Sequence, residues 1–115
     1  MAVTYAQVRD WVLALPGGRE VMVEEWGHPT LRVNDKMFAS GSEGSPSVTV
    51  KASKEVQEEL IAGDPETFSF PKYVGRFGWV EVQLSRVDPD ELRDLVIEAW
   101  RRTAPKKLVK EYDAA

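Results

Sequence analysis

Four cations and four rings are the side chains of this 115-residue chain whose types suit the binding of an anionic ligand. The cations are Arg32, Lys51, Lys72 and Arg76, and the rings are Trp26, His28, Tyr73 and Trp79. Guanidinium and ammonium groups bind phosphates, and aromatic faces stack on unpaired bases or cations. If the fold gathers these side chains on one face, they form an anion-binding surface. In the alternative, the two tryptophans are core residues, glycines 27 and 78 allow tight packing, and the cations are a solvated face.

Catalytic chemistry has little support in the residue types present. His28 is the only histidine and the chain has no cysteine. A catalytic histidine needs a positioned partner, whereas His28 precedes Pro29, where we expect it to hydrogen-bond the backbone of a turn. Ser40, Ser42 and Ser45 lack the G-x-S-x-G pattern of a nucleophile elbow. We therefore predict no catalytic residues and a non-enzymatic protein.

Metal and phosphate-loop sites are also not expected. Glu20, Glu24 and Glu25 could join His28 around a cation, but one neutral nitrogen with scattered carboxylates is a weak ligand set for a transition metal. Solvated charge is the favoured interpretation of these glutamates. Residues 41–45, GSEGS, lack the lysine and the following helix of a phosphate loop. The sequence thus predicts neither a metal nor a cofactor.

The overall composition is that of an ordinary folded domain. Apolar residues make up 43% and charged residues 30% of the chain, which argues against intrinsic disorder. At 115 residues we expect a single domain over residues 1–115. The net charge is −4. Because DNA affinity depends on cations that neutralise phosphates, this charge opposes DNA binding by the chain as a whole and leaves a local basic surface as the route to it.

Cysteine usage and hydropathy indicate the compartment. A chain without cysteine is compatible with a reducing cytosol, and the first residues lack the basic and apolar stretches of a secretory signal. No apolar run approaches the roughly 20 residues needed to cross a bilayer. We expect a cytoplasmic protein without a membrane role. A monomer is the default expectation, because no long unpaired apolar stripe is evident.

The first half of the chain predicts one helix followed by strands. A capping box formed by Thr4 and Gln7 precedes apolar residues at helical spacing, which predicts a helix over residues 5–15. Residues 20–26 form a β-branched stretch that we interpret as a strand. Asn34 and Asp35 tolerate the positive φ of a type I′ turn and predict a hairpin of residues 30–33 and 36–40. Its register places residues 31, 33 and 38 on the core face, and residues 32 and 37 on the other.

The second half alternates strands and helices. Residues 47–51 predict a strand, and Ser53 caps a helix that we expect Gly63 to end in a left-handed conformation. Residues 64–77 are interpreted as an irregular loop, and residues 78–84 as a strand with residues 80, 82 and 84 facing inward. Asp88 and Pro89 start a helix that ends before Pro105. Residues 106–115 form a polar tail, either a flexible end or a brief helix. This order predicts an α+β fold, with about five antiparallel strands and helices on one face.

Four stretches of the chain match a known pattern nearly end to end. They are ALPG at residues 14–17, WGHPTLRV at 26–33, KMFA at 36–39 and YVGRFGWV at 73–80. Lys51, the Asp64-Pro65 step and the helix that begins at Asp88 add to the agreement. With these residues the chain resembles the MmcQ/YjbR family. The resemblance implies a double-wing α+β fold, similar in outline to frataxin-like domains, and an association with DNA binding. Frataxin-like iron binding needs an acidic first helix, and here that helix offers only Asp10.

Two functional hypotheses follow. In the first, the cations and rings named at the outset bind DNA or another anionic partner. In the second, Trp26, Trp79 and His28 line a pocket for a small molecule or a protein, and Arg76 orients a carboxylate or phosphate of the ligand.

Overall fold

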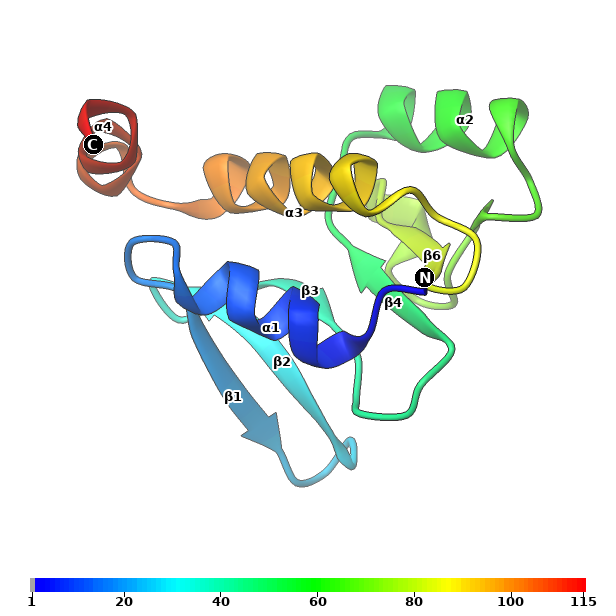
Figure 1. Cartoon of the computed structure of the whole chain (residues 1–115), viewed down its shortest axis with the longest axis horizontal. Helices are drawn as coiled ribbons and strands as arrows, with labels where there is room; N and C mark the ends of the chain where they lie inside the picture. Colours follow the sequence, from blue (N-terminus) through cyan, green and yellow to red (C-terminus); the bar gives the residue numbers. More distant parts are fainter. Residues whose placement is uncertain (1) are drawn as a thin grey trace.

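Six strands form one antiparallel sheet in the computed structural model, which describes residues 2–115 (Figure 1). The elements follow the order α1 (Tyr5–Leu13), β1 (Arg19–Val23), β2 (His28–Val33), β3 (Lys36–Ser40), β4 (Ser47–Val50), α2 (Lys54–Gly63), β5 (Phe68–Ser69), the 3₁₀ helix η1 (Gly75–Phe77), β6 (Val80–Gln83), α3 (Pro89–Thr103) and α4 (Lys106–Ala114). The predicted α+β class is confirmed. The sheet has one strand more than expected, because Phe68 and Ser69 pair with β6 inside the segment interpreted as irregular.

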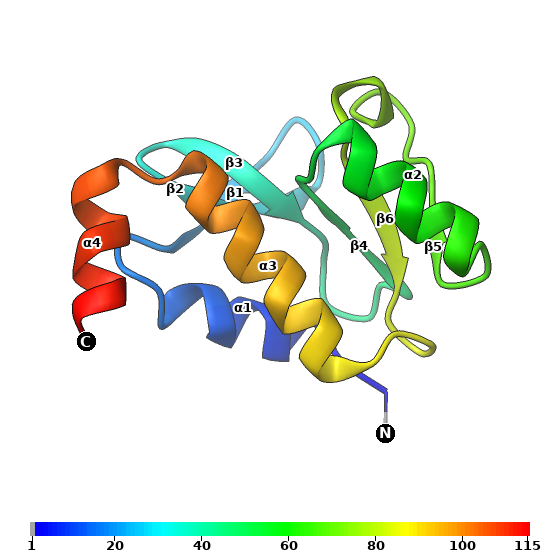
Figure 2. The ribbon, with the colours of Figure 1, turned by 90° about the horizontal axis from the view of Figure 1, so that it is seen from above.

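The strand order across the sheet is β1-β2-β3-β4-β6-β5. The first four strands are neighbours in sequence, whereas β6 lies between β4 and β5. Helices α1 and α3 run across the same side of this sheet, and α2 lies on that side near β5 and β6 (Figure 2). In the part of the chain that the structure describes, none of these three helices covers the opposite face of the sheet.

The core lies between the sheet and the helices. Val48 is paired with Val82, and Val50 with Val80, and all four side chains are buried. Trp100 of α3 is fully buried, and its indole N–H donates to the carbonyl oxygen of Pro16 at 3.0 Å. The strict alternation of the strand sequences therefore has the predicted consequence, with valines inward and polar residues outward.

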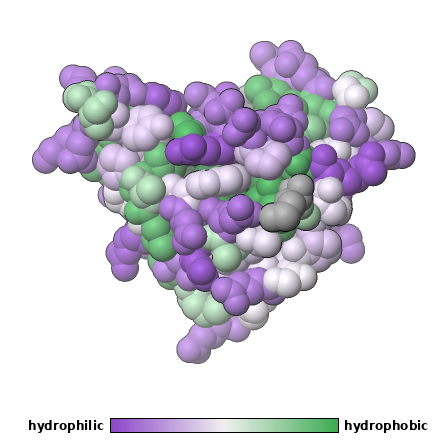
Figure 3. All heavy atoms as spheres, in the orientation of Figure 1, coloured by the Kyte–Doolittle hydropathy of each residue, from purple (hydrophilic) through white to green (hydrophobic). Residues whose placement is uncertain are grey.

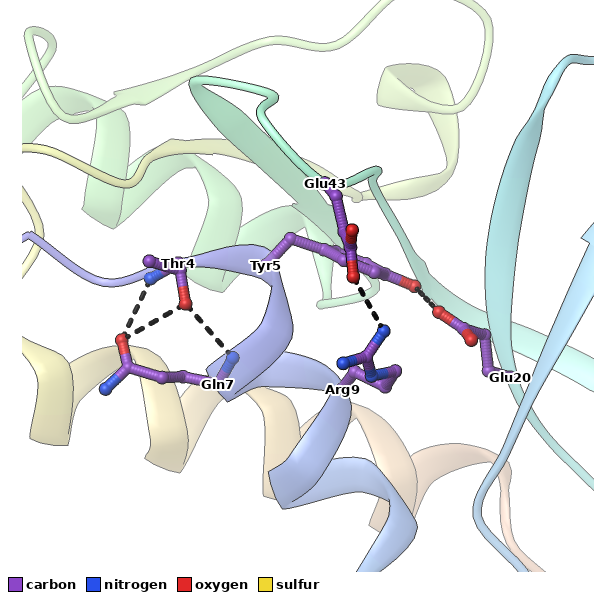
Figure 4. Close-up of polar contacts among 6 residues, drawn as sticks. All are labelled: Thr4, Tyr5, Gln7, Arg9, Glu20 and Glu43. Carbon is purple, nitrogen blue, oxygen red and sulfur yellow. Dashed lines mark hydrogen bonds and ion pairs between the residues drawn. The ribbon is translucent and has the colours of Figure 1, made fainter.

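Helix α1 begins at the predicted capping box and has one polar contact with β1 and one with the loop between β3 and β4 (Figure 4). The Thr4 hydroxyl accepts from the Gln7 backbone N–H, and the Gln7 side chain accepts from the Thr4 N–H at 2.9 Å. The Tyr5 hydroxyl donates to a Glu20 carboxylate oxygen at 2.7 Å. Arg9 forms an ion pair with Glu43 at 3.0 Å. Caps at Ser53 and Asp88 likewise start α2 and α3 as predicted.

The predicted hairpin is present, and its register is the predicted one for the two residue pairs next to the turn. Asn34 and Asp35 have φ values of 50° and 62°, as a type I′ turn requires. Leu31 and Val33 are buried, and Arg32 is paired with Met37. The register shifts between residues 31 and 32, which accommodates one extra residue in β3.

Four predicted boundaries are wrong. Helix α1 ends at Leu13 rather than at residue 15, because the N–H of Leu15 donates to the Val12 carbonyl and closes a turn. The first strand ends at Val23, because the N–H groups of Trp26 and Gly27 donate to the Val23 carbonyl and close a turn. Gly63 belongs to α2 and has no positive φ, and Asp64 occupies the cap position instead. The last strand is shorter than residues 78–84. Of the two alternatives for residues 106–115, the helix is the one that forms.

The face seen in Figure 3 is largely hydrophilic, and hydrophobic residues show mainly in the seams between elements. Within residues 2–115, none of the helices combines the length and the apolar composition that a membrane crossing requires.

Candidate functional site

A groove of about 850 Å³ lies on the face of the sheet opposite the helices. Its floor comes from β3, β4 and β6, where Thr49 and Glu81 alternate with buried valines. Its walls come from the β1–β2 turn and from the segment between β5 and η1. The lining residues are Trp26, His28, Met37, Ser40, Thr49, Phe70, Pro71, Lys72, Tyr73, Val74, Trp79 and Glu81.

The groove unites five of the eight residues singled out from the sequence. Trp26, His28, Lys72, Tyr73 and Trp79 all line it, although they come from two segments far apart in the chain. The remaining three, Arg32, Lys51 and Arg76, do not line it.

The β1–β2 turn supplies one wall. Because this turn closes on Val23, Trp26 lies at its tip with 53% of its surface exposed rather than in the core. The ring of His28 lies 6.0 Å from that of Trp26, centroid to centroid. His28 Nδ1 lies 3.1 Å from the carbonyl oxygen of Pro29, the backbone hydrogen bond that the sequence led us to expect. Because a carbonyl oxygen only accepts, Nδ1 is the donor of this bond, which fixes the ring orientation.

A strained turn supplies the opposite wall. Tyr73 has a φ of 66°, and the N–H of Val74 donates to the carbonyl oxygen of Lys72 at 2.7 Å. A hydrogen bond across one residue of positive φ defines the rare γ-turn, which an L-residue adopts only under constraint. The turn presents the Tyr73 side chain to solvent with 89% of its surface exposed.

The constraint on this wall comes from α2. The amide nitrogen of the buried Gln57 side chain donates to the carbonyl oxygens of Gly75 at 2.8 Å and Trp79 at 2.5 Å. Gly78 has a φ of 94°, and a Cβ there would lie 2.8 Å from the backbone of Lys54. Trp79 itself is only 7% exposed and forms a fixed part of the groove. Trp79 is therefore buried, as the core interpretation expected, but it lines the groove outside the main core cluster; for the exposed Trp26 the core interpretation is wrong.

The floor of the groove is polar. Ser40, Thr49 and Glu81 are paired in one row across three adjacent strands. Glu81 also accepts a hydrogen bond from the Ser47 hydroxyl at 2.8 Å. The floor thus offers two hydroxyl groups and one carboxylate, so hydrogen-bond donors of a ligand would find acceptors there.

The four predicted cations do not form one basic cluster in the groove. Arg32 is held along the sheet by Thr30, whose hydroxyl accepts from Arg32 Nε at 2.9 Å, and by Asp35, whose carboxylate lies 3.9 Å away. The guanidinium of Arg76 lies over the ring of Phe77, 4.8 Å from its centroid. Lys51 is half-buried directly after β4. Lys72 alone contributes positive charge to the lining.

His28, the one histidine of the groove, hydrogen-bonds a backbone carbonyl, and among residues 2–115 no hydrogen bond joins it to Ser40 or Thr49. Across residues 2–115, no three histidine, aspartate or glutamate side chains are placed to hold a metal ion together. What the arrangement can provide is stacking surface, floor acceptors and one cation.

Sequence reasoning missed the floor and part of the wall: Met37, Ser40, Thr49, Phe70, Pro71, Val74 and Glu81. The alternation of the strands did indicate that Thr49 and Glu81 face away from the core. What the alternation could not indicate is that β4 and β6 are adjacent, since this pairing joins strands about 30 residues apart and depends on the tertiary fold.

Comparisons with known proteins identify the family. The family model described as YjbR matches residues 13–102. The uncharacterized proteins Mb2600 of Mycobacterium bovis and Rv2570 of Mycobacterium tuberculosis are each 34% identical to this chain over 109 residues, covering 90% of it and 78% of their own length. The crystal structure of Deinococcus radiodurans DR2400, which carries a DUF419 domain, is similar with a TM-score of 0.76 and 20% identity, over 84% of this chain and 75% of that one. The protein therefore belongs to the YjbR family.

Proposed function

We propose that this protein is a non-enzymatic, cytoplasmic DNA-binding domain and that DNA occupies the groove on the open face of the sheet. The observation that carries the proposal is the groove lining, in which Trp26, His28 and Tyr73 surround a polar floor and Lys72 lies at the wall. Rings that flank a cation are the combination that single-stranded nucleic-acid sites use.

Charge determines how strong this binding is. With one cation in the groove and a net charge of −4, the phosphate contribution is small. Each phosphate contact contributes about 0.7 to 0.9 to the slope of log affinity against log salt, so we expect a slope near one. Binding is therefore weak at physiological salt and clear at low salt, with ring contacts supplying much of the affinity.

The test compares fluorescence anisotropy of labelled DNA with the wild type and two lysine variants. Lys72→Ala should weaken binding and reduce the salt slope by about one, because it removes the phosphate contact. Lys106→Ala is the matched control, since it removes the same charge from α4. Absence of binding to any DNA at low salt, or equal effects of both variants, would contradict the proposal.

A small, ring-bearing anion is the second candidate ligand. It is favoured by the presence of Trp26, Trp79 and His28 in one groove, as the second hypothesis requires, although Arg76 does not line it. A metabolite library tested by thermal shift separates the two candidates. A ligand at a hundred times its dissociation constant stabilises the fold by about 2.7 kcal/mol, whereas unchanged melting across the library counts against this function.

A further inference from the structure

We infer that the groove binds the unpaired bases of a single DNA strand and discriminates against duplex DNA. This inference rests on the proposed function and assigns the class of DNA that the groove receives.

The first argument is shape. A duplex is read by protein elements that project into its grooves, because its bases are stacked inside and only their edges are accessible. The site here is concave and lies between two walls on an open sheet. A hollow of about 850 Å³ can receive a base only after that base has left the stack. A single strand offers such bases without the cost of unpairing.

The second argument is exposed aromatic surface. Trp26, Phe70 and Tyr73 line the groove with 53%, 61% and 89% of their surfaces exposed. Large rings are seldom left so open without a partner, and their faces stack on any base. Paired bases in a duplex cannot reach these faces.

The third argument is the sign of the charges inside the groove. The carboxylate of Glu81 lies in the floor and Lys72 belongs to the wall. A phosphate placed on the floor would be repelled by Glu81, whereas an N–H group on the Watson–Crick edge of an unpaired base, such as N3–H of thymine, would donate to it. The charges therefore orient a strand with its bases inward and its phosphates along the wall that carries Lys72. A rigid duplex would bring two charged backbones to the groove, and the Watson–Crick N–H groups of its bases are already engaged in pairing.

The fourth argument is that the wall is fixed before the ligand arrives. Gln57 holds the carbonyls of Gly75 and Trp79, and the γ-turn at Tyr73 keeps its ring projecting. Residues held in sparsely populated backbone conformations cluster at functional sites. A preformed wall lowers the entropic penalty of ordering the site around a flexible strand.

The experiment measures anisotropy at low salt with three labelled decamers: oligodeoxythymidine, a duplex of equal length, and an abasic strand with the same phosphates. We expect the thymidine strand to bind at least tenfold more tightly than the other two, since stacking on two or three rings is lost in both. If the duplex binds as tightly as the strand, the inference is wrong while the proposed function stands. If the abasic strand binds as tightly as the thymidine strand, the inferred recognition of bases is wrong. If none binds, both proposals fail.

Two variants test whether the bases stack on the aromatic side chains of the groove. Tyr73→Ala should weaken binding of the thymidine strand by about tenfold and leave abasic binding unchanged, because only a base stacks on the ring. Phe77→Ala is the matched control, since Phe77 is an aromatic residue of the same segment, 61% exposed, that does not line the groove. Tyr73 is almost fully exposed, so its truncation leaves folding intact. Equal losses in the two variants would overturn the inference.

Discussion

At the scale of single residues, Gln57 connects the fold to the candidate site. Its side chain is buried, and its one amide nitrogen serves two backbone carbonyls of the segment that forms the groove wall. Buried carbonyls need a donor, and Gln57 supplies one to Trp79 and a second one to Gly75, which also accepts from the Gly78 N–H. Gln57 therefore acts on the ligand indirectly, as a positioning residue for Tyr73 and Trp79.

Replacing Gln57 by Leu tests this role. We expect the free energy of unfolding to fall by about 1–3 kcal/mol in urea titrations, because the Trp79 carbonyl loses the Gln57 donor and the Gly75 carbonyl keeps only the Gly78 N–H. Affinity for the thymidine strand should fall as well, although Gln57 does not line the groove. Glu58→Ala, an exposed neighbour on α2, is the control. Unchanged affinity in a folded Gln57→Leu variant would show that the wall positions itself without this amide.

Gln57 also illustrates what the sequence could not provide. A glutamine on a short helix is ordinarily solvated, and nothing in its neighbours indicates two carbonyls about 20 residues further along the chain. His28 is the opposite case. Its proline neighbour indicated a turn with a local hydrogen bond, and the structure has that bond.

At the scale of elements, local signals were sufficient where the chain contacts itself nearby. Capping at Thr4, Ser53 and Asp88 and the turn at Asn34 and Asp35 involve groups at most three residues apart, so the sequence predicted them correctly. The end of β1 was wrong by three residues because two competing structures, strand and turn, suit residues 24–26. That difference matters, since it moves Trp26 from the core to the groove.

Helix α1 and strand β1 are joined by Tyr5 and Glu20, which gives a pH-dependent prediction. Burial raises the pKa of the Tyr5 phenol first, and its hydrogen bond to the Glu20 carboxylate raises it further. A raised pKa in the folded state means that the protonated phenol stabilises the fold below its unfolded value of about 10, and that this contribution is lost progressively as the pH rises above that value. Tyr5→Phe should therefore unfold more easily at neutral pH, by about 1.5 kcal/mol, as expected for a hydrogen bond to a charged acceptor.

Denaturant titrations at several pH values measure this effect. The difference between wild type and Tyr5→Phe should narrow above pH 10, because only the wild type loses stability as the phenol ionises. Tyr73→Phe is the control, since that hydroxyl belongs to an almost fully exposed side chain. A difference that stays constant up to strongly alkaline pH would contradict the assigned cause.

At the scale of the whole molecule, the two faces of the sheet have different roles. The helices bury one face of the sheet and the other face stays open, so the fold creates a surface that two distant segments can enclose (Figure 2). The family resemblance and the binary pattern predicted this architecture. The groove depends on β6 lying between β4 and β5, an order that no local pattern specifies.

The acidic balance of the chain also acts at this scale. The net charge of −4 lowers the affinity for any anionic ligand through long-range repulsion. The affinity for a duplex is lowered more than that for a single strand, because the duplex carries twice the phosphates. The expected cluster of four cations would have offset that repulsion. Because these cations do not cluster in the groove, recognition of DNA there depends mainly on stacking on the aromatic rings.

The indole N–H signals of the four tryptophans test the central claim most directly, because NMR resolves them separately. Trp26 and Trp79 line the groove, whereas Trp11 packs on the core and the Trp100 N–H is bound to Pro16. On titration with the thymidine decamer, the Trp26 signal should move most, Trp79 should move less, and Trp11 and Trp100 should stay in place. A Trp26 signal that is unmoved while labelled DNA is saturated would contradict recognition of DNA by this groove.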